Sequence, residues 1–176
     1  AVWTLYDDYN WHKKNVIKIN KEGYYSWDYN SLYQYLKKMR IQYIFTDDEL
    51  ISFWKNQIAI VIRKTSQFDR EYHSYKIGDM DINQFCKHSN EIYSELQAVY
   101  NQCDDACFPM PYSKYEKFHD KSYELVTNAR SLVFISASYK KENSNEKNLK
   151  DCIELELKNY YKTLKEWEDI MQIEKI

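Results

Sequence analysis

From Thr46 to the end of the chain, large apolar residues recur at alternating spacings of three and four, the repeat of one face of an α-helix. Gly78 and Asp79, residues 108–111 and the polar run 140–147 interrupt this pattern. Proline cannot continue a helical hydrogen-bond ladder, and glycine often ends one. Four segments therefore remain, each with one apolar seam. The seams are Ile51, Trp54, Ile58, Val61, Thr65, Phe68, Tyr72 and Tyr75; Ile82, Phe85, Ser89, Ile92, Leu96, Val99 and Cys103; Tyr115, Phe118, Ser122, Leu125, Ala129, Leu132, Ser136 and Tyr139; and Leu149, Ile153, Leu157, Tyr160, Leu164, Trp167 and Met171.

The pattern predicts an all-α fold, an antiparallel up-down four-helix bundle over residues 46–176. Thr46 and Glu49 have the spacing of a capping box, which places the start of the first helix at Thr46. The chain of 176 residues has only two glycines and two prolines. This scarcity disfavours sandwiches and barrels, which need many tight turns, and excludes a glycine-rich phosphate loop.

Residues 1–45 differ from the rest and are predicted to form a separate aromatic-rich segment. They hold 12 of the 30 aromatic residues and a charge balance of +3, against −5 for the remainder. Residues 16–19 and 24–27 flank Gly23 and could pair as a short hairpin, and Ser31 could cap a short helix over residues 32–40. A segment this short must bury surface to be ordered, so we expect it to pack on the bundle.

Four aromatic residues of this segment, Tyr24, Tyr25, Trp27 and Tyr29, are the candidate binding residues. Tyrosine and tryptophan offer a large contact area with a polar tip, which suits protein interfaces. The alternative is that the same rings only pack the segment onto the bundle. The net charge of −2 gives no reason to expect a nucleic acid or an anionic membrane as partner.

The four cysteines, Cys86, Cys103, Cys107 and Cys152, are compatible with two disulfides in three possible connectivities. The alternative is four buried thiols in helix interfaces. If the protein is exported, a bond between Cys103 and Cys107 is the favoured pairing, because oxidising compartments preserve disulfides.

No catalytic residues or cofactor are predicted, because the sequence contains no recognisable catalytic motif. Glu116 and His119 have the Glu-x-x-His spacing used in carboxylate-bridged di-iron bundles. Such a site needs a second copy of the motif, which is missing, so no metal ligands are assigned. A cytoplasmic metal-binding or enzymatic bundle using these two residues is kept as an alternative.

The last two predicted helices resemble those of small exported helical-bundle proteins and lipoproteins of low-GC Gram-positive bacteria. The resemblance is carried by residues 111–119, where a proline opens a helix with an aromatic residue and a histidine in its first turns. A polar loop and the charged helix from Leu149 to Met171 follow. The resemblance implies export and a helical bundle, and it assigns no activity.

These observations favour a non-enzymatic, extracytoplasmic protein-interaction module that binds a protein or a cell-envelope partner. The first residue is Ala1 and not Met, and Trp3 and Tyr6 suit a membrane–water boundary. We therefore expect a membrane tether upstream of residue 1, with simple truncation at a domain edge as the alternative. A structural subunit of a helical assembly is the further alternative, since its seams could pair with the helices of another chain.

Overall fold

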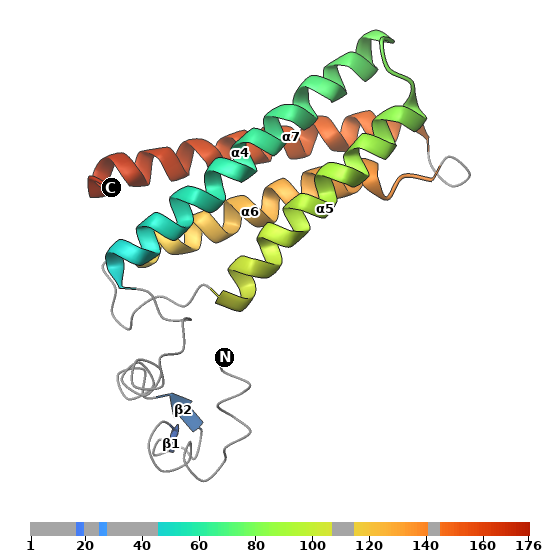
Figure 1. Cartoon of the computed structure of the whole chain (residues 1–176). Coiled ribbons are helices and arrows are strands. Elements are labelled where there is room, and N and C mark those ends of the chain that lie inside the picture. Colours follow the sequence, from blue (N-terminus) through green and yellow to red (C-terminus); the bar gives the residue numbers. More distant parts are fainter. Residues whose placement is uncertain (1–16, 20–24, 28–45, 107–114, 141–144) are drawn as a thin grey trace.

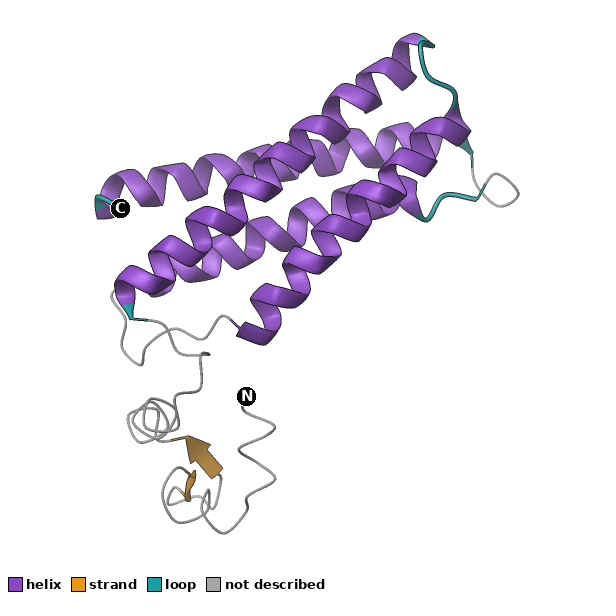
Figure 2. Cartoon of the chain, viewed as in Figure 1, coloured by secondary structure: helices purple, strands orange, loops and turns teal. Residues whose placement is uncertain are grey.

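The computed structural model describes residues 17–19, 25–27, 46–106, 115–140 and 145–176. Four α-helices account for most of them (Figures 1 and 2): α4 spans Asp47–Ile77, α5 Ile82–Ala106, α6 Glu116–Ala137 and α7 Glu146–Glu174. The prediction of four helices from residue 46 onward is confirmed. Consecutive helices run in opposite directions in Figure 1.

Two short strands precede the helices. β1 (Ile17–Ile19) pairs antiparallel with β2 (Tyr25–Trp27), so that Ile17 lies opposite Trp27 and Ile19 opposite Tyr25. The expected turn around Gly23 and the expected helix over residues 32–40 lie outside the described residues.

The start of α4 follows from its capping box. The Thr46 hydroxyl accepts a hydrogen bond from the Glu49 amide at 3.3 Å, and a Glu49 carboxylate oxygen accepts one from the Thr46 amide at 2.8 Å. The helix ends at Gly78, whose φ of +87° is the left-handed conformation that favours glycine. Both boundaries agree with the sequence prediction.

The core lies along the predicted seams, with small shifts at their ends. In α4 the buried residue of the first turn is Leu50, while the predicted Ile51 is only partly buried. In α7 Thr163 is buried and the predicted Leu164 is partly buried. These shifts arise because an ideal helix has 3.6 residues per turn and drifts slowly against a strict heptad.

Helix α6 lies at the centre of the packing. It packs extensively against both α5 and α7 and also contacts α4. Val126 and Val133 are fully buried beside the seam residues Leu125 and Leu132, so α6 is buried over a wider arc than one seam provides. The heptad pattern predicts four equivalent helices, and the observed packing is less symmetrical.

None of the helices in the described ranges is long and apolar enough to span a membrane.

Candidate interaction surface

Five side chains lie where α5 and α6 pack together, and we call them the α5–α6 stripe: Tyr93, Tyr100, Tyr123, Arg130 and Phe134. The rings of Tyr93 and Phe134 have their centroids 5.3 Å apart, and those of Tyr100 and Tyr123 are 5.8 Å apart. The Tyr123 hydroxyl donates a 3.2 Å hydrogen bond to that of Tyr100. The guanidinium carbon of Arg130 lies 4.2 Å from the centre of the Tyr100 ring.

The stripe follows from the helical repeat of its two elements. Tyr93 and Tyr100 are seven residues apart on α5, and Tyr123, Arg130 and Phe134 are spaced by seven and four on α6. Both spacings keep side chains on one face of a helix. The two helices run antiparallel, so the earlier tyrosine of α5 meets the later aromatic residue of α6.

Arg130 is the one charged member of the stripe. No carboxylate among the described residues forms an ion pair with it. Its contact is instead the face of the Tyr100 ring, which attracts a cation through the ring quadrupole. The guanidinium carries several N–H donors in a planar fork, which suits a planar acceptor such as a carboxylate.

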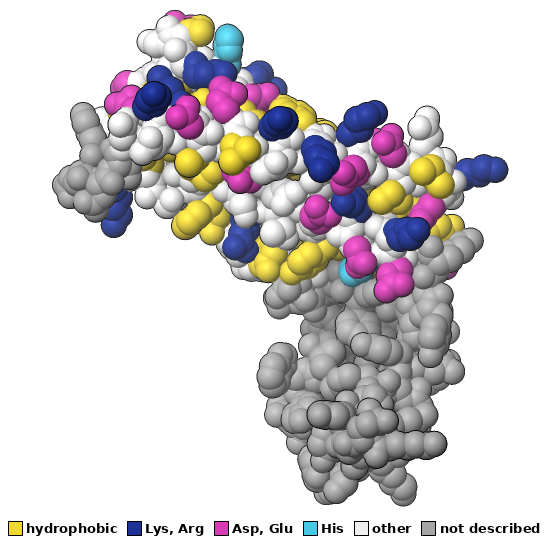
Figure 3. Space-filling model, turned by 180° about the vertical axis from the view of Figure 1, so that it is seen from behind, with side chains coloured by type: hydrophobic (Ala, Val, Ile, Leu, Met, Phe, Trp, Pro, Cys, Tyr) yellow, Lys and Arg dark blue, Asp and Glu magenta, His cyan; other side chains and the backbone are white. Residues whose placement is uncertain are grey.

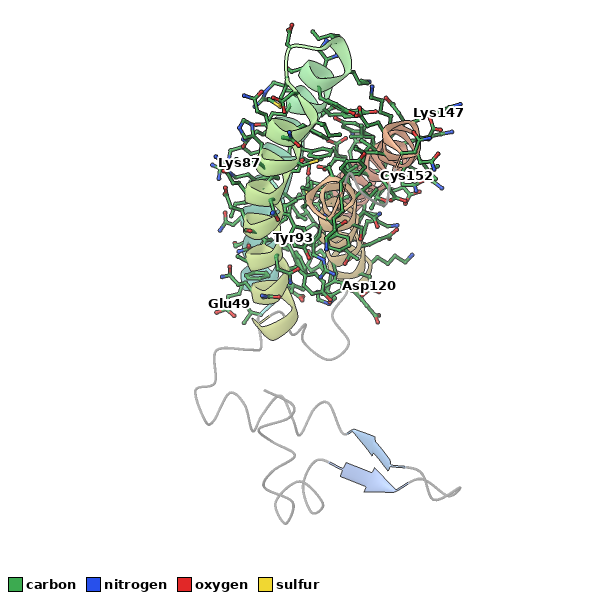
Figure 4. All side chains as sticks on the ribbon, turned by 90° about the vertical axis from the view of Figure 1, so that its right-hand side faces the viewer. Glu49, Lys87, Tyr93, Asp120, Lys147 and Cys152 are labelled. Carbon is green, nitrogen blue, oxygen red and sulfur yellow. The ribbon has the colours of Figure 1, made fainter. Side chains whose placement is uncertain are left out.

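The stripe is open to solvent to different degrees. Phe134 is 50% exposed, and the other four residues are partly buried. Figure 4 shows Tyr93 on the side of α5 next to α6, whereas Lys87 points away from the bundle. Tyrosine, phenylalanine and arginine are enriched in protein interfaces, and other charged residues are depleted there. The composition of the stripe therefore suits a protein contact.

The remaining surface is mixed in character. Figure 3 views the molecule from behind the view of Figure 1, and on that face hydrophobic side chains lie among acidic and basic ones. Two large apolar side chains of α7 are strongly exposed, Leu155 at 58% and Ile173 at 78%.

Glu116 and His119, the two candidate metal ligands, differ in their exposure to solvent. Glu116 is exposed, whereas His119 is partly buried and its Nδ1 accepts a 3.0 Å hydrogen bond from the indole N–H of Trp54. Burial lowers the pKa of His119, and the nearby carboxylates of Asp120 and Glu116 only partly oppose this. The Nδ1 lone pair is engaged in this bond and is not available to a metal ion. Within the described ranges no three metal-ligating side chains lie together.

A second polar arrangement connects α4 with α7, and we call it the tyrosine–carboxylate ladder. The Tyr72 hydroxyl donates to Glu154 at 3.1 Å and the Tyr75 hydroxyl donates to Glu146 at 2.7 Å. Nearer the middle of the helices, the Tyr161 hydroxyl of α7 donates to Asp69 at 2.6 Å. Burial, and then the carboxylate partner, raises the pKa of each of the three tyrosines.

Lys76 completes the ladder. Lys76 pairs with Glu154 at 2.8 Å, and its ammonium lies 4.6 Å from the centre of the Tyr72 ring. The hydrogen bond from Lys76 lowers the pKa of Glu154. The ladder uses its polar groups on one another, which indicates a role in holding α4 and α7 together.

A polar pocket of about 220 Å³ lies between α6 and α7. Lys121 pairs with two of its lining residues, with Glu124 at 2.6 Å and with Glu166 at 2.8 Å. The amide of Asn128 donates to the Thr163 hydroxyl at 2.8 Å. These hydrogen bonds and ion pairs join α6 to α7 along the pocket.

The cysteines lie in different environments. Cys86 and Cys152 are free thiols, the first partly buried and the second exposed in a pocket of about 280 Å³. The alternative with two disulfides is therefore wrong, because it needs all four cysteines paired. The exposure of Cys152 also overturns the alternative of four buried thiols. Cys103 is buried and Cys107 lies outside the described residues, so their pairing stays a prediction.

The predicted binding residues fall in the first part of the chain. Tyr25 and Trp27 belong to β2, while Tyr24 and Tyr29 lie outside the described residues. Their role stays a prediction.

The sequence analysis did not identify the α5–α6 stripe. A signal was present, since Tyr93 and Tyr100 on one helix, and Tyr123, Arg130 and Phe134 on the next, repeat with helical spacing beside the seams and not within them. In the sequence alone such residues cannot be distinguished from ordinary surface residues, because only the packing of α5 against α6 brings them together.

Comparison with known proteins found no match among family models, curated proteins or solved structures.

Proposed function

We propose that this chain is a non-enzymatic, extracytoplasmic interaction module that binds a protein partner. Its bundle has the antiparallel up-down arrangement, and the aromatic segment of residues 1–45 packs on it. The observation that supports binding is the α5–α6 stripe, with its solvent-exposed Phe134 and an Arg130 that has no carboxylate partner among the described residues.

The stripe supports binding for a physical reason. An exposed aromatic ring gains free energy when a partner removes it from water, at roughly 25 cal/mol per Å² of apolar area. Arg130 adds a directional contact, because a guanidinium can pair through two N–H groups with one carboxylate. A central anchor of this kind carries most of the free energy of binding in well-studied interfaces.

The predicted surface formed by Tyr24, Tyr25, Trp27 and Tyr29 is the second part of this proposal. We propose that these residues extend the contact with the partner or envelope component. Replacing all four with alanine should weaken partner capture and leave the helicity of the bundle unchanged. Unchanged capture, or loss of the fold, would contradict this part.

The stripe itself is tested by site-specific photocrosslinking in the native host. A photoreactive phenylalanine analogue at position 134 should crosslink to one discrete polypeptide. The matched control carries the same analogue at position 155, where Leu155 is similarly exposed on α7. Arg130→Ala should abolish the crosslink from position 134. Equal crosslinking from both positions, or none from position 134, would reject the stripe as a binding surface.

A further inference from the structure

The exposed side of α7 carries a second pattern that matches the α5–α6 stripe. Lys162, Asp169 and Ile173 are spaced by seven and four residues. Tyr123, Arg130 and Phe134 of α6 have the same two spacings in the same order. Two helices laid parallel in this register bring three complementary pairs together over about 16 Å, the length of eleven helical residues.

Each pair is favourable in its chemistry. Ile173 meets Phe134, so the two most exposed apolar side chains of their helices cover one another. Asp169 meets Arg130 and supplies a carboxylate, a partner that this guanidinium does not find among the described residues. Lys162 meets the Tyr123 ring, which is a cation–π contact.

The three α7 side chains are available for such a contact. Ile173 is 78% exposed, and the side chains of Lys162 and Asp169 are 77% and 53% exposed. Within the helix, the Lys162 ammonium lies 4.0 Å from a carboxylate oxygen of Glu166. The Lys165 ammonium lies 3.8 Å from a carboxylate oxygen of Asp169. Such exposed ion pairs contribute little to stability, so their rearrangement costs little.

We infer that the partner on the α5–α6 stripe is a second copy of this chain, which presents Lys162, Asp169 and Ile173 of its α7. This inference rests on the proposed function and names the partner of the same surface. The two contacting surfaces differ, so in a pair one copy still has a free α5–α6 stripe and the other still has a free α7 surface. Association therefore continues head to tail beyond a pair, unless the copies close into a ring.

The test is sedimentation of the full chain over a wide range of concentration. A contact limited to three helical turns is weak, so the range extends to about 1 mM. The average mass of the wild-type chain should rise above that of the monomer as concentration increases. Arg130→Glu and Asp169→Arg should each keep the chain monomeric with unchanged circular dichroism. The double variant, which restores opposite charges in exchanged positions, should associate again.

The matched control is Asp151→Arg together with Leu155→Ser. These residues also place an acidic and an exposed apolar side chain four apart on α7, but without a lysine seven residues before the acidic one. The control should associate like the wild type. A monomeric wild type, a double variant that stays monomeric, or a control as impaired as Asp169→Arg would each overturn the inference. A crosslink from position 134 to a different protein would overturn it too, while the proposed function would stand.

Discussion

The indole N–H of Trp54 on α4 donates its hydrogen bond to Nδ1 of His119 on α6, 65 residues further along the chain. Trp54 is fully buried, and its ring meets that of His119 edge to face with centroids 5.5 Å apart. An Nδ1 atom that accepts this bond cannot carry a proton. The pair therefore requires the imidazole to be neutral, in agreement with the lowered pKa of His119.

This requirement predicts a loss of stability in mild acid. The unfolded histidine takes up a proton near its ordinary pKa of 6.5, and the folded one does so only at lower pH. The unfolded state thus binds more protons in this window, so the free energy of unfolding falls as the pH drops below about 6.5. Urea denaturation at pH 7.5 and pH 5.5 measures the difference.

Variants assign this effect to one residue. His119→Gln should flatten the dependence on pH, because glutamine can accept the Trp54 hydrogen bond and does not titrate. His73→Gln, at an exposed position of α4, should keep the wild-type dependence. An unchanged dependence in His119→Gln would show that other groups cause the effect.

Two fully buried serines, Ser122 and Ser89, should respond differently to replacement by alanine. The Ser122 hydroxyl accepts a 2.7 Å hydrogen bond from the indole of Trp167 and donates one to the Phe118 carbonyl. Ser122→Ala strands a buried N–H, and we expect it to cost about 1–3 kcal/mol. The Ser89 hydroxyl is buried and has no hydrogen-bond partner in the part of the chain that the structure describes, so Ser89→Ala should be neutral or stabilising.

A double-mutant cycle sharpens this comparison. Trp167→Phe removes the stranded donor, so Ser122→Ala should cost less in that background than in the wild type. Chemical denaturation of the four proteins gives the coupling. Additive costs would mean that the bond does not contribute.

The tyrosine–carboxylate ladder predicts a response at alkaline pH. The folded state holds the protons of Tyr72, Tyr75 and Tyr161 above their ordinary pKa of 10.0. The folded state then binds more protons than the unfolded one, so stability is complete below pH 10 and falls as the pH rises above it. Ultraviolet titration of the phenolate should show these three ionising late, and their replacement by phenylalanine should remove that late fraction.

Gly78 gives a purely conformational prediction. Its φ is +87°, and a Cβ placed there would meet no atom within 4 Å. Gly78→Ala should therefore cost about 1 kcal/mol through backbone strain alone. Gly78→Asn should cost less, because asparagine tolerates the left-handed region better. Thermal unfolding of the two variants tests this order, and equal stability of Gly78→Ala and wild type would contradict it.

The sequence was sufficient to predict the helices because their signals are local. The capping box at Thr46 and Glu49 and the break at Gly78 depend on neighbours within one turn, and the buried residues of α5 follow the predicted seam from Phe85 to Cys103. What could not be predicted depends on how helices are placed. The central position of α6 buries Val126 and Val133 beyond its seam.

The candidate surface was harder to predict for the same reason. Tyr100 and Arg130 form a unit only because α5 and α6 lie antiparallel in one particular register. Likewise, the bond between Trp54 and His119 joins helices that are distant in sequence, and the spacing of Glu116 and His119 suggested a different chemistry. Contacts between distant residues leave no periodic trace in the sequence.

The ladder also has a consequence for the order in which the molecule forms. It joins the first helix of the bundle to the last, whereas α5, α6 and α7 each pack on a neighbour in sequence. Closing the longest loops is entropically the most expensive step, so we expect these bridges to form after the rate-limiting barrier of folding has been crossed. Contacts that are absent from the folding transition state affect the rate of unfolding and not the rate of folding. We therefore expect the phenolic bridges between α4 and α7 to act as a latch that sets the lifetime of the folded molecule.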